Sequence, residues 1–136
     1  LYSQNTVWDE LYEMAKSIRK PRNISGMISG GQVGAAILTK NHNIYSGVCI
    51  ATASTLGMCG ERNAIANMIT NGENEISKLV CVDSKGKVGS PCGACREYLM
   101  QLDKNSKNIE ILKDDKTKEI IKLEELLPDW WGYDRV

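Results

Sequence analysis

Two short cysteine motifs restrict what this chain can fold into more than any other feature. The first is Cys59-Gly60-Glu61 and the second is Pro91-Cys92-Gly93-Ala94-Cys95, and each opens a segment with the apolar periodicity of a helix. A fold that uses both motifs must bring two helix N-termini together. The three cysteines then supply the protein ligands of a catalytic zinc site, which keeps its fourth position open for water.

The spacing of these residues separates a hydrolytic zinc site from commoner cysteine patterns. A Cys-x-x-Cys pair alone also occurs in structural zinc sites and redox dithiols, but here a Cys-x-Glu precedes it by about thirty residues. Glu61 lies two residues beyond a ligand, where its carboxylate can move protons to and from water beside the metal. The alternative is a structural zinc knot with Glu61 on the surface. That site needs a fourth ligand, and the single histidine, His42, lies in an expected turn.

Length and composition limit the class of protein. The 136 residues suit one domain, 1–136, that is large enough to fold without disulfides. Lys and Arg total 17 and Asp and Glu total 17, and this zero net charge argues against a nucleic acid polymer as substrate. No apolar run is long enough to cross a membrane, so no membrane partner is expected. Five cysteines, three with metal spacing, indicate a reducing compartment and predict a cytoplasmic protein.

Helix and strand patterns alternate along the chain, which predicts an α/β fold. The glycine-rich stretch around Gly26, Gly30 and Gly31 is expected to be a loop. Helices are expected at 6–20, at 59–70, from Pro91 to about 102, and at 123–127. Strands are expected at 32–39, 44–51, 78–83, 109–112 and 119–121, the first two forming a hairpin.

With their neighbours included, the cysteine motifs resemble those of the cytidine deaminase family. Cys-Gly-Glu-Arg-Asn-Ala-Ile at 59–65 and Pro-Cys-Gly-Ala-Cys-Arg-Glu at 91–97 are similar to that family's Cys-Ala-Glu-Arg-Thr-Ala and Pro-Cys-Gly-Ala-Cys-Arg-Gln. The resemblance extends to 33–38, 44–47 and Leu126-Leu127-Pro128, so it covers nearly the whole chain. It implies a three-layer α/β/α fold in which a mixed five-stranded sheet is flanked by helices on both faces. The small blasticidin S deaminases share this framework.

The resemblance implies hydrolytic deamination of a small cytosine nucleoside or nucleoside analogue, with Zn²⁺ as the cofactor. Cys59, Cys92 and Cys95 would bind the metal. Glu61 would take a proton from water and deliver protons to N3 of the cytosine ring and to the departing ammonia.

Other site residues also follow from the resemblance. Arg62 and Arg96 match arginines thought to donate hydrogen bonds to the ligand sulfurs, which would offset the negative charge of three thiolates. The alternative is that both are solvated arginines on helix surfaces. Gly60 and Pro91 are expected beside the substrate.

The expected sugar-binding positions depart from the family. Cytidine deaminases usually have Asn-Val-Glu-Asn after the second-strand glycine, and the first Asn and the Glu hydrogen-bond the ribose. Here these positions hold Cys49 and Ala51, and neither replaces a carboxylate that accepts from a hydroxyl. A buried hydroxyl left unpaired costs about 1 to 3 kcal/mol. Blasticidin S deaminases also depart from the ribose-binding pair, so antibiotic inactivation of that type is the alternative function.

The C-terminal aromatic residues and the quaternary structure complete these expectations. In the family, the tail is thought to bring an aromatic from a neighbouring subunit over the base, and Trp131 stands at that offset. A plain core or interface role for this tryptophan is an equal alternative. Relatives of this type are homotetramers, and the same is expected here. Two further alternatives are a non-catalytic zinc-binding protein of the same fold and a polynucleotide-editing deaminase, against which the zero net charge counts.

Overall fold

A computed structural model describes residues 4–136 and places seven strands in one mixed sheet. The longest strand, β2 (Ser29–Thr39), pairs antiparallel with β3 (Ile44–Ala51) and with β4 (Ile76–Val82). Beyond β4, the sheet continues with β6 (Glu110–Leu112), parallel to β4, and β7 (Ile120–Lys122), antiparallel to β6. The short strands β1 (Arg22–Asn23) and β5 (Val88–Gly89) pair with β2 and β4.

Seven strands replace the five that the resemblance implied. The additional strands, β1 and β5, have two residues each, and they pair where the chain passes beside β2 and β4. Two residues are too few for side-chain alternation to show in a sequence, so only the path of the chain reveals them.

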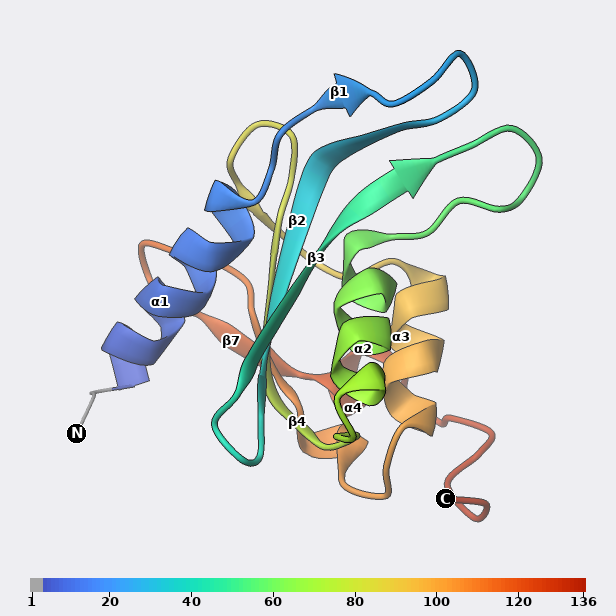
Figure 1. The fold of residues 1–136 in the computed structure, drawn as a ribbon. Coiled ribbons are helices and arrows are strands. Elements are labelled where there is room, and N and C mark those ends of the chain that lie inside the picture. Colours follow the sequence, from blue (N-terminus) through green and yellow to red (C-terminus); the bar gives the residue numbers. More distant parts are fainter. Residues whose placement is uncertain (1–3) are drawn as a thin grey trace.

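Helices cover both faces of the sheet, which confirms the three-layer α/β/α architecture (Figure 1). Helix α1 (Gln4–Ser17) lies on one face, where Trp8, Leu11 and Ala15 pack against alternate residues of β2 and β4. Helices α2 (Gly60–Thr70) and α3 (Gly93–Gln101) lie on the other face. The main core fills the space between them and the sheet, and its β2 and β4 side chains are Ala35, Ile37, Ile76, Leu79 and Cys81.

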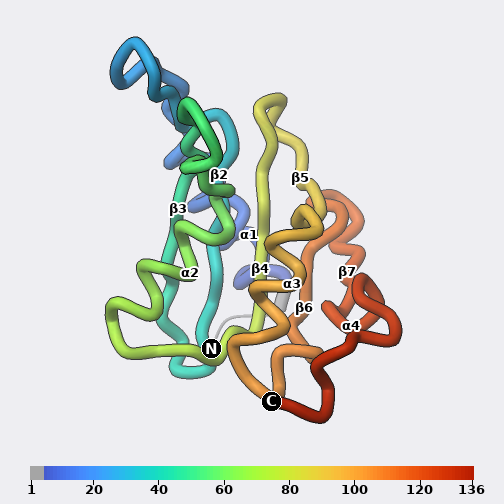
Figure 2. The backbone as a smooth tube through the Cα atoms, turned by 90° about the vertical axis from the view of Figure 1, so that its right-hand side faces the viewer, coloured from blue at the N-terminus to red at the C-terminus, as the bar shows by residue number. Residues whose placement is uncertain are grey.

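The last elements lie beside α3 (Figure 2). A 3₁₀ turn at Ser106–Asn108 precedes β6, and the short helix α4 (Leu123–Leu126) follows β7. No helix within residues 4–136 is both long and apolar enough to cross a lipid bilayer.

Helix α2 approaches β3 closely because residue 47 is a glycine. A Cβ atom at Gly47 would lie 2.5 Å from the backbone nitrogen of Ala64 and 2.8 Å from the carbonyl carbon of Asn63. No side chain fits at these separations, so a larger residue at 47 would push the helix away from the sheet. This contact sets how close the N-terminal end of α2 lies to the sheet.

The expected loop around Gly30 and Gly31 is instead the start of β2. Both glycines belong to the strand, and its register with β3 shifts between Gly30 and Gly34. Gly31 has a φ of +89°, which other residues rarely adopt. Glycine in a strand can mark a bulge as well as a loop, so the sequence pattern pointed to the wrong choice.

Glu73, just after α2, ties that helix to the β2–β3 hairpin. Its carboxylate accepts hydrogen bonds from the Tyr45 hydroxyl at 2.7 Å, from Asn43 Nδ2 at 2.9 Å and from Asn41 Nδ2 at 3.2 Å. Together with a hydrogen bond from the Thr39 side chain, these bonds hold the pKa of Glu73 down at about 2, and Tyr45 contributes most, with Thr39 next. The charged carboxylate is therefore favoured in the folded state.

This network predicts a pH-dependent loss of stability in Glu73→Gln. A carboxyl whose folded pKa is depressed stabilises the fold above its unfolded pKa of about 4.3, and this contribution disappears as the pH falls toward 2. We expect the variant to unfold at lower urea concentration than the parent protein at pH 7, and the difference to shrink between about pH 4.3 and pH 2. Urea titrations followed by tryptophan fluorescence measure it. A difference that stays constant over this range would rule out the charge as its cause.

Candidate active site

Helices α2 and α3 begin side by side, and a cysteine precedes each of them. Cys59 is the N-cap of α2 and Cys92 is the N-cap of α3, both with extended backbone (φ −69°, ψ 154° and φ −68°, ψ 169°). Neither side chain makes a capping hydrogen bond. Cys95 lies in the first turn of α3. The two helix N-termini therefore place three sulfur atoms together, where the partial positive charge of the helix ends favours thiolates.

Four side chains form one cluster at this point. The ligand atoms of Cys59, Glu61, Cys92 and Cys95 all lie within 4.8 Å of one another. The Sγ atom of Cys92 is 3.5 Å from the Sγ of Cys59 and 3.5 Å from the Sγ of Cys95. A tetrahedral zinc ion with Zn–S bonds of about 2.3 Å would hold its sulfurs roughly 3.8 Å apart. The sulfur cluster therefore fits zinc with little movement.

The cluster opens on one side into a cavity of about 240 Å³. Cys95 and Glu61 are buried, Cys59 is half-buried and Cys92 is exposed, so access comes from the side of Cys92. Around the cluster, seven further residues line this cavity: Val33, Cys49, Gly60, Cys81, Asp83, Gly89 and Ser90. Most of that lining is apolar, which suits the binding of a flat ring beside a few polar groups.

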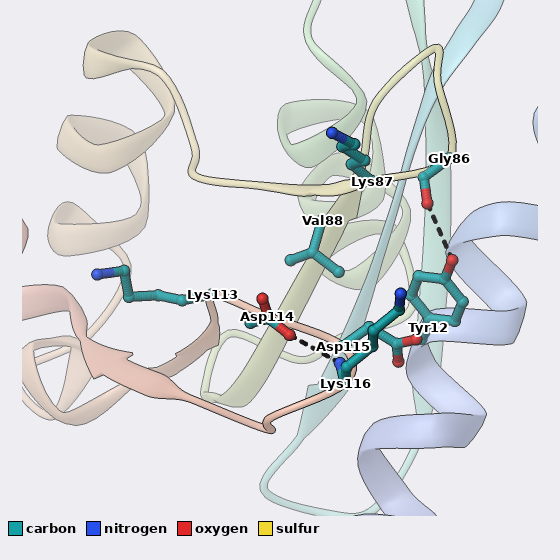
Figure 3. Close-up of a pocket in the computed structure, with 8 residues that line it drawn as sticks. All are labelled: Tyr12, Gly86, Lys87, Val88, Lys113, Asp114, Asp115 and Lys116. Atoms are coloured by element: carbon teal, nitrogen blue, oxygen red, sulfur yellow. Dashed lines mark hydrogen bonds between the residues drawn. The ribbon is translucent and has the colours of Figure 1, made fainter.

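A larger cavity, of about 340 Å³, lies on the α1 side of the molecule (Figure 3). There the Tyr12 hydroxyl donates to the Gly86 carbonyl at 2.9 Å, and Asp114 accepts from the backbone N–H of Lys116 at 2.8 Å. Its polar groups thus belong to turn structure, and none of its eight lining residues is a cysteine or a histidine. The smaller cavity is the candidate active site because it holds the ligand cluster.

Comparisons with known proteins agree with this geometry. Residues 7–110 match the model of the cytidine and deoxycytidylate deaminase zinc-binding region. A cytidine deaminase of Mycoplasma genitalium is 32% identical over 95 residues, which is 68% of this chain and 73% of the relative. The chain belongs to the cytidine deaminase family.

Two further proteins are similar to this chain, one in its solved structure and one over part of its sequence. The crystal structure of cytidine deaminase from Mycobacterium tuberculosis has a TM-score of 0.75 at 27% identity, covering 92% of this chain and 97% of that one. A blasticidin-S deaminase of Bacillus cereus is 38% identical over 76 residues, 49% of this chain and 54% of the relative. The zinc requirement expected from the cysteine motifs agrees with the family.

The structure brings some of the expected substrate-binding residues to the cavity and not others. Cys49 and Gly60 line it, whereas Ala51 is exposed at the end of β3 and does not. Pro91 is buried at the turn into α3. Trp131 is 59% exposed, and its indole N–H donates to Glu97 Oε1 on α3 at 3.1 Å. Within one chain, Trp131 is therefore held outside the cavity.

Sequence reasoning missed Cys81 and Asp83 as lining residues. Both lie at the carboxyl end of β4, two positions apart, on the side that α2 and α3 cover. Period-two alternation from the buried Leu79 would have placed Cys81 on this face. The adjacency of that face to Glu61 depends on how α2 packs, which a single sequence does not give.

The two arginines have different partners. Arg62 lies against the cluster, where its hydrogen bond to Cys59 is the main cause of its raised pKa. Arg96 instead donates from Nε to the Pro91 carbonyl at 2.7 Å and from Nη1 to the Leu126 carbonyl at 3.4 Å. The structure therefore places Arg62 next to a sulfur. Arg96 instead links the turn before α3 to α4 by donating to one main-chain carbonyl in each.

The three thiols differ in how readily they ionise. Burial raises the pKa of Cys59 and, more strongly, that of Cys95, where the nearby Glu61 carboxylate acts in the same direction. Burial also opposes ionisation of Cys92. Hydrogen bonds from the Cys95 backbone N–H and from the neighbouring thiols outweigh it and lower the pKa of Cys92. Cys92 is the thiolate that the fold favours first.

Zinc binding should therefore release protons. Because the pKa values of Cys59 and Cys95 are raised, both thiols carry protons near neutral pH and must lose them to the metal. We expect the release of between about two and three protons per zinc and an affinity that falls as the pH is lowered. Calorimetry in buffers of different ionisation enthalpy counts the protons. A pH-independent affinity would contradict three-thiolate ligation.

Arg62→Gln and Arg96→Gln form a matched pair of variants. Loss of the Arg62 charge beside the sulfurs should weaken zinc affinity about 10- to 100-fold, the usual effect of removing a group that supports a metal ligand. Arg96→Gln breaks bonds to carbonyls, so it should lower the melting temperature with little change in zinc affinity. Competition with a chromophoric chelator measures the affinities. Equal zinc affinities in the two variants would contradict the assignment.

Proposed function

We propose that this chain is a zinc-dependent deaminase that converts a cytosine nucleoside, or a nucleoside analogue containing cytosine, to the uracil form and releases ammonia. The observation that carries this proposal is a buried carboxylate, Glu61, placed within 4.8 Å of three thiol ligands and facing a cavity. A site with three protein ligands leaves a coordination position for water, whereas structural zinc sites use four. The cofactor is Zn²⁺, held by Cys59, Cys92 and Cys95.

Zinc held by Cys59, Cys92 and Cys95 would lower the pKa of a water molecule and would so supply a nucleophile at neutral pH. Glu61 accepts a proton from that water and passes it to N3 of the cytosine ring. The water oxygen bonds to C4, the C4–N4 bond breaks, and Glu61 delivers the second water proton to the leaving nitrogen as ammonia departs. Arg62, beside Cys59, reduces the negative charge that three thiolates place around the reacting ring.

The sugar-facing side of the cavity supports a substrate other than an ordinary ribonucleoside. The Cys49 sulfur accepts from the Val33 backbone N–H at 3.3 Å and lies 3.5 Å from Gln32 Oε1, so its hydrogen bonds are made within the protein. The Asp83 carboxylate accepts the backbone N–H groups of Lys85 at 2.8 Å and of Lys87 at 3.0 Å. Both bonds go to Oδ1, so Oδ2 is the Asp83 oxygen left at this wall, and Ala51, outside the cavity, supplies no carboxylate at the expected sugar-binding position.

Inactivation of a blasticidin S-type antibiotic is the second candidate. It is favoured by the similarity to the Bacillus cereus protein named blasticidin-S deaminase and by the two replaced sugar-binding positions, Cys49 and Ala51. A substrate whose cytosine is attached to an unusual sugar loses nothing when a ribose-binding carboxylate is absent.

The remaining parts of the proposal concern assembly and location. The expected homotetramer is supported by exposed aromatics near the C-terminus, Trp131 at 59% and Tyr133 at 44%, which suit a subunit contact. A base-stacking role for Trp131 belongs to the same proposal. The cysteines are free thiols, which suits a reducing cytoplasm. Zero net charge makes a nucleic acid polymer a poor partner.

Glu61→Gln tests catalysis directly. Ammonia release by the zinc-loaded protein should fall at least about 100-fold, because proton transfer by a placed carboxylate contributes that much or more. Zinc content should stay unchanged, since Glu61 stands beside the ligand set. Cytidine, 2′-deoxycytidine, free cytosine and blasticidin S are assayed in parallel. Full activity in the variant would contradict the role of Glu61, and zinc binding without turnover of any compound would favour a non-catalytic zinc-binding protein.

A further inference from the structure

One wall of the active-site cavity carries a carboxylate that the reaction at the cytosine ring does not use. Asp83 follows β4 directly and lines the cavity beside the ligand cluster. We propose that Asp83 selects the substrate, because its carboxylate accepts a hydrogen bond from a protonated amine on the part of the substrate beyond the cytosine ring. This inference rests on the proposed function and names its substrate class, a cytosine nucleoside whose sugar carries an amino group.

The turn that holds Asp83 uses one of its two carboxylate oxygens. Oδ1 accepts from the backbone N–H groups of Lys85 at 2.8 Å and of Lys87 at 3.0 Å. Oδ2 has no hydrogen-bond or ion-pair partner among residues 4–136. An ionised carboxylate can accept about four hydrogen bonds. Oδ2 is therefore the oxygen that can accept one from a molecule in the cavity.

The backbone of this turn is fixed from two sides. The Asp83 N–H donates to the Lys87 carbonyl at 2.8 Å, and the Gly86 N–H donates back to the Asp83 carbonyl at 3.0 Å. Arg19 Nη1, just after α1, also donates to the Asp83 carbonyl at 2.7 Å. The Tyr12 hydroxyl on α1 donates to the Gly86 carbonyl at 2.9 Å (Figure 3). The carboxylate is thus placed before a ligand arrives, which reduces the entropy lost on binding.

The other polar groups of the cavity do not compete for this role. Glu61 serves the reaction in the ligand cluster. The Cys49 sulfur accepts from the Val33 backbone N–H at 3.3 Å. Ser90 lines the cavity with a neutral hydroxyl. Asp83 is therefore the lining residue that offers a charged acceptor to the rest of the substrate.

The charges around the cavity favour a cation at this wall. None of the residues that line it is a lysine, an arginine or a histidine, whereas Asp83 and Glu61 both carry carboxyl groups. The hydrogen bond from the Lys87 backbone is the main cause that holds the pKa of Asp83 below its ordinary value, so this carboxylate is ionised at neutral pH. A protonated amine gains from the charge as well as the hydrogen bond, a hydroxyl gains from the hydrogen bond alone, and a phosphate is repelled.

Asp83→Asn changes the unpaired atom and preserves the turn. The asparagine oxygen still accepts the two turn N–H groups, while an amide nitrogen, which only donates, replaces Oδ2. Asp114→Asn is the matched control, because Asp114 Oδ1 likewise accepts the backbone N–H groups of Lys116 at 2.8 Å and of Thr117 at 2.9 Å, outside the active-site cavity. Both variants should lose similar thermal stability, so a difference in ligand binding between them reports the cavity.

Calorimetry measures binding to zinc-loaded protein that also carries Glu61→Gln, so that no ligand is consumed. The ligands are cytidine, 3′-amino-3′-deoxycytidine and 5′-amino-5′-deoxycytidine. We expect at least one amino compound to bind about 10-fold more tightly than cytidine, because a hydrogen bond between charged partners is stronger than one from a neutral hydroxyl. Asp83→Asn should abolish this preference and Asp114→Asn should keep it. Equal affinities for the three compounds, or a preference that survives Asp83→Asn, would overturn the inference.

Deamination is measured separately, with Glu61 intact. A preference for an amine that Asp83→Asn abolishes, without deamination of any cytosine compound by the parent protein, would contradict the proposed function and leave Asp83 as a binding residue. Deamination of a cytosine compound with no preference for an amine would support the proposed function and overturn the role of Asp83.

Discussion

The meeting of two helix N-termini over one face of the sheet is the constraint on which the rest of the site depends. Helices α2 and α3 run in the same direction and are each preceded by a cysteine, and the Sγ atoms of Cys59 and Cys92 lie 3.5 Å apart. This approach is possible because the sheet beneath is built from small residues. Gly47 admits the backbone of α2, and Ala35 and Gly89 leave space beside β4. Two helix dipoles then act on the same group of thiols.

Charge balance explains which side chains surround this point. Three thiolates and a carboxylate would place a large negative charge in a buried corner, and that arrangement needs compensation. Zinc supplies most of it, and Arg62 and the helix N-termini supply the rest. The rest of the lining is mostly apolar, and Asp83 there uses Oδ1 to accept from two turn N–H groups. The charged groups of the cavity are therefore concentrated at the ligand cluster.

The sequence allowed the ligand set and most of the layers to be predicted, because both depend on local patterns. Spacing of Cys59, Cys92 and Cys95 requires only that two helices begin at the same place. The short, nearly continuous apolar runs in β2 and β4 are typical of strands buried on both faces. The two-residue strands β1 and β5 have no local pattern. The partners of Arg96 and the place of Cys81 in the cavity wall depend on contacts between distant segments. Ala51 was expected at the sugar from the resemblance alone, and the course of β3 places it outside the cavity.

The central claim is that zinc is held here by three sulfurs with one coordination position left for the reaction. X-ray absorption spectroscopy of the zinc-loaded protein at neutral pH tests it most directly, because it counts sulfur and light-atom neighbours separately. The account predicts three sulfurs at about 2.3 Å and one oxygen or nitrogen at about 2.0 to 2.1 Å. Four sulfur neighbours would instead describe a closed structural site and would contradict the proposed chemistry.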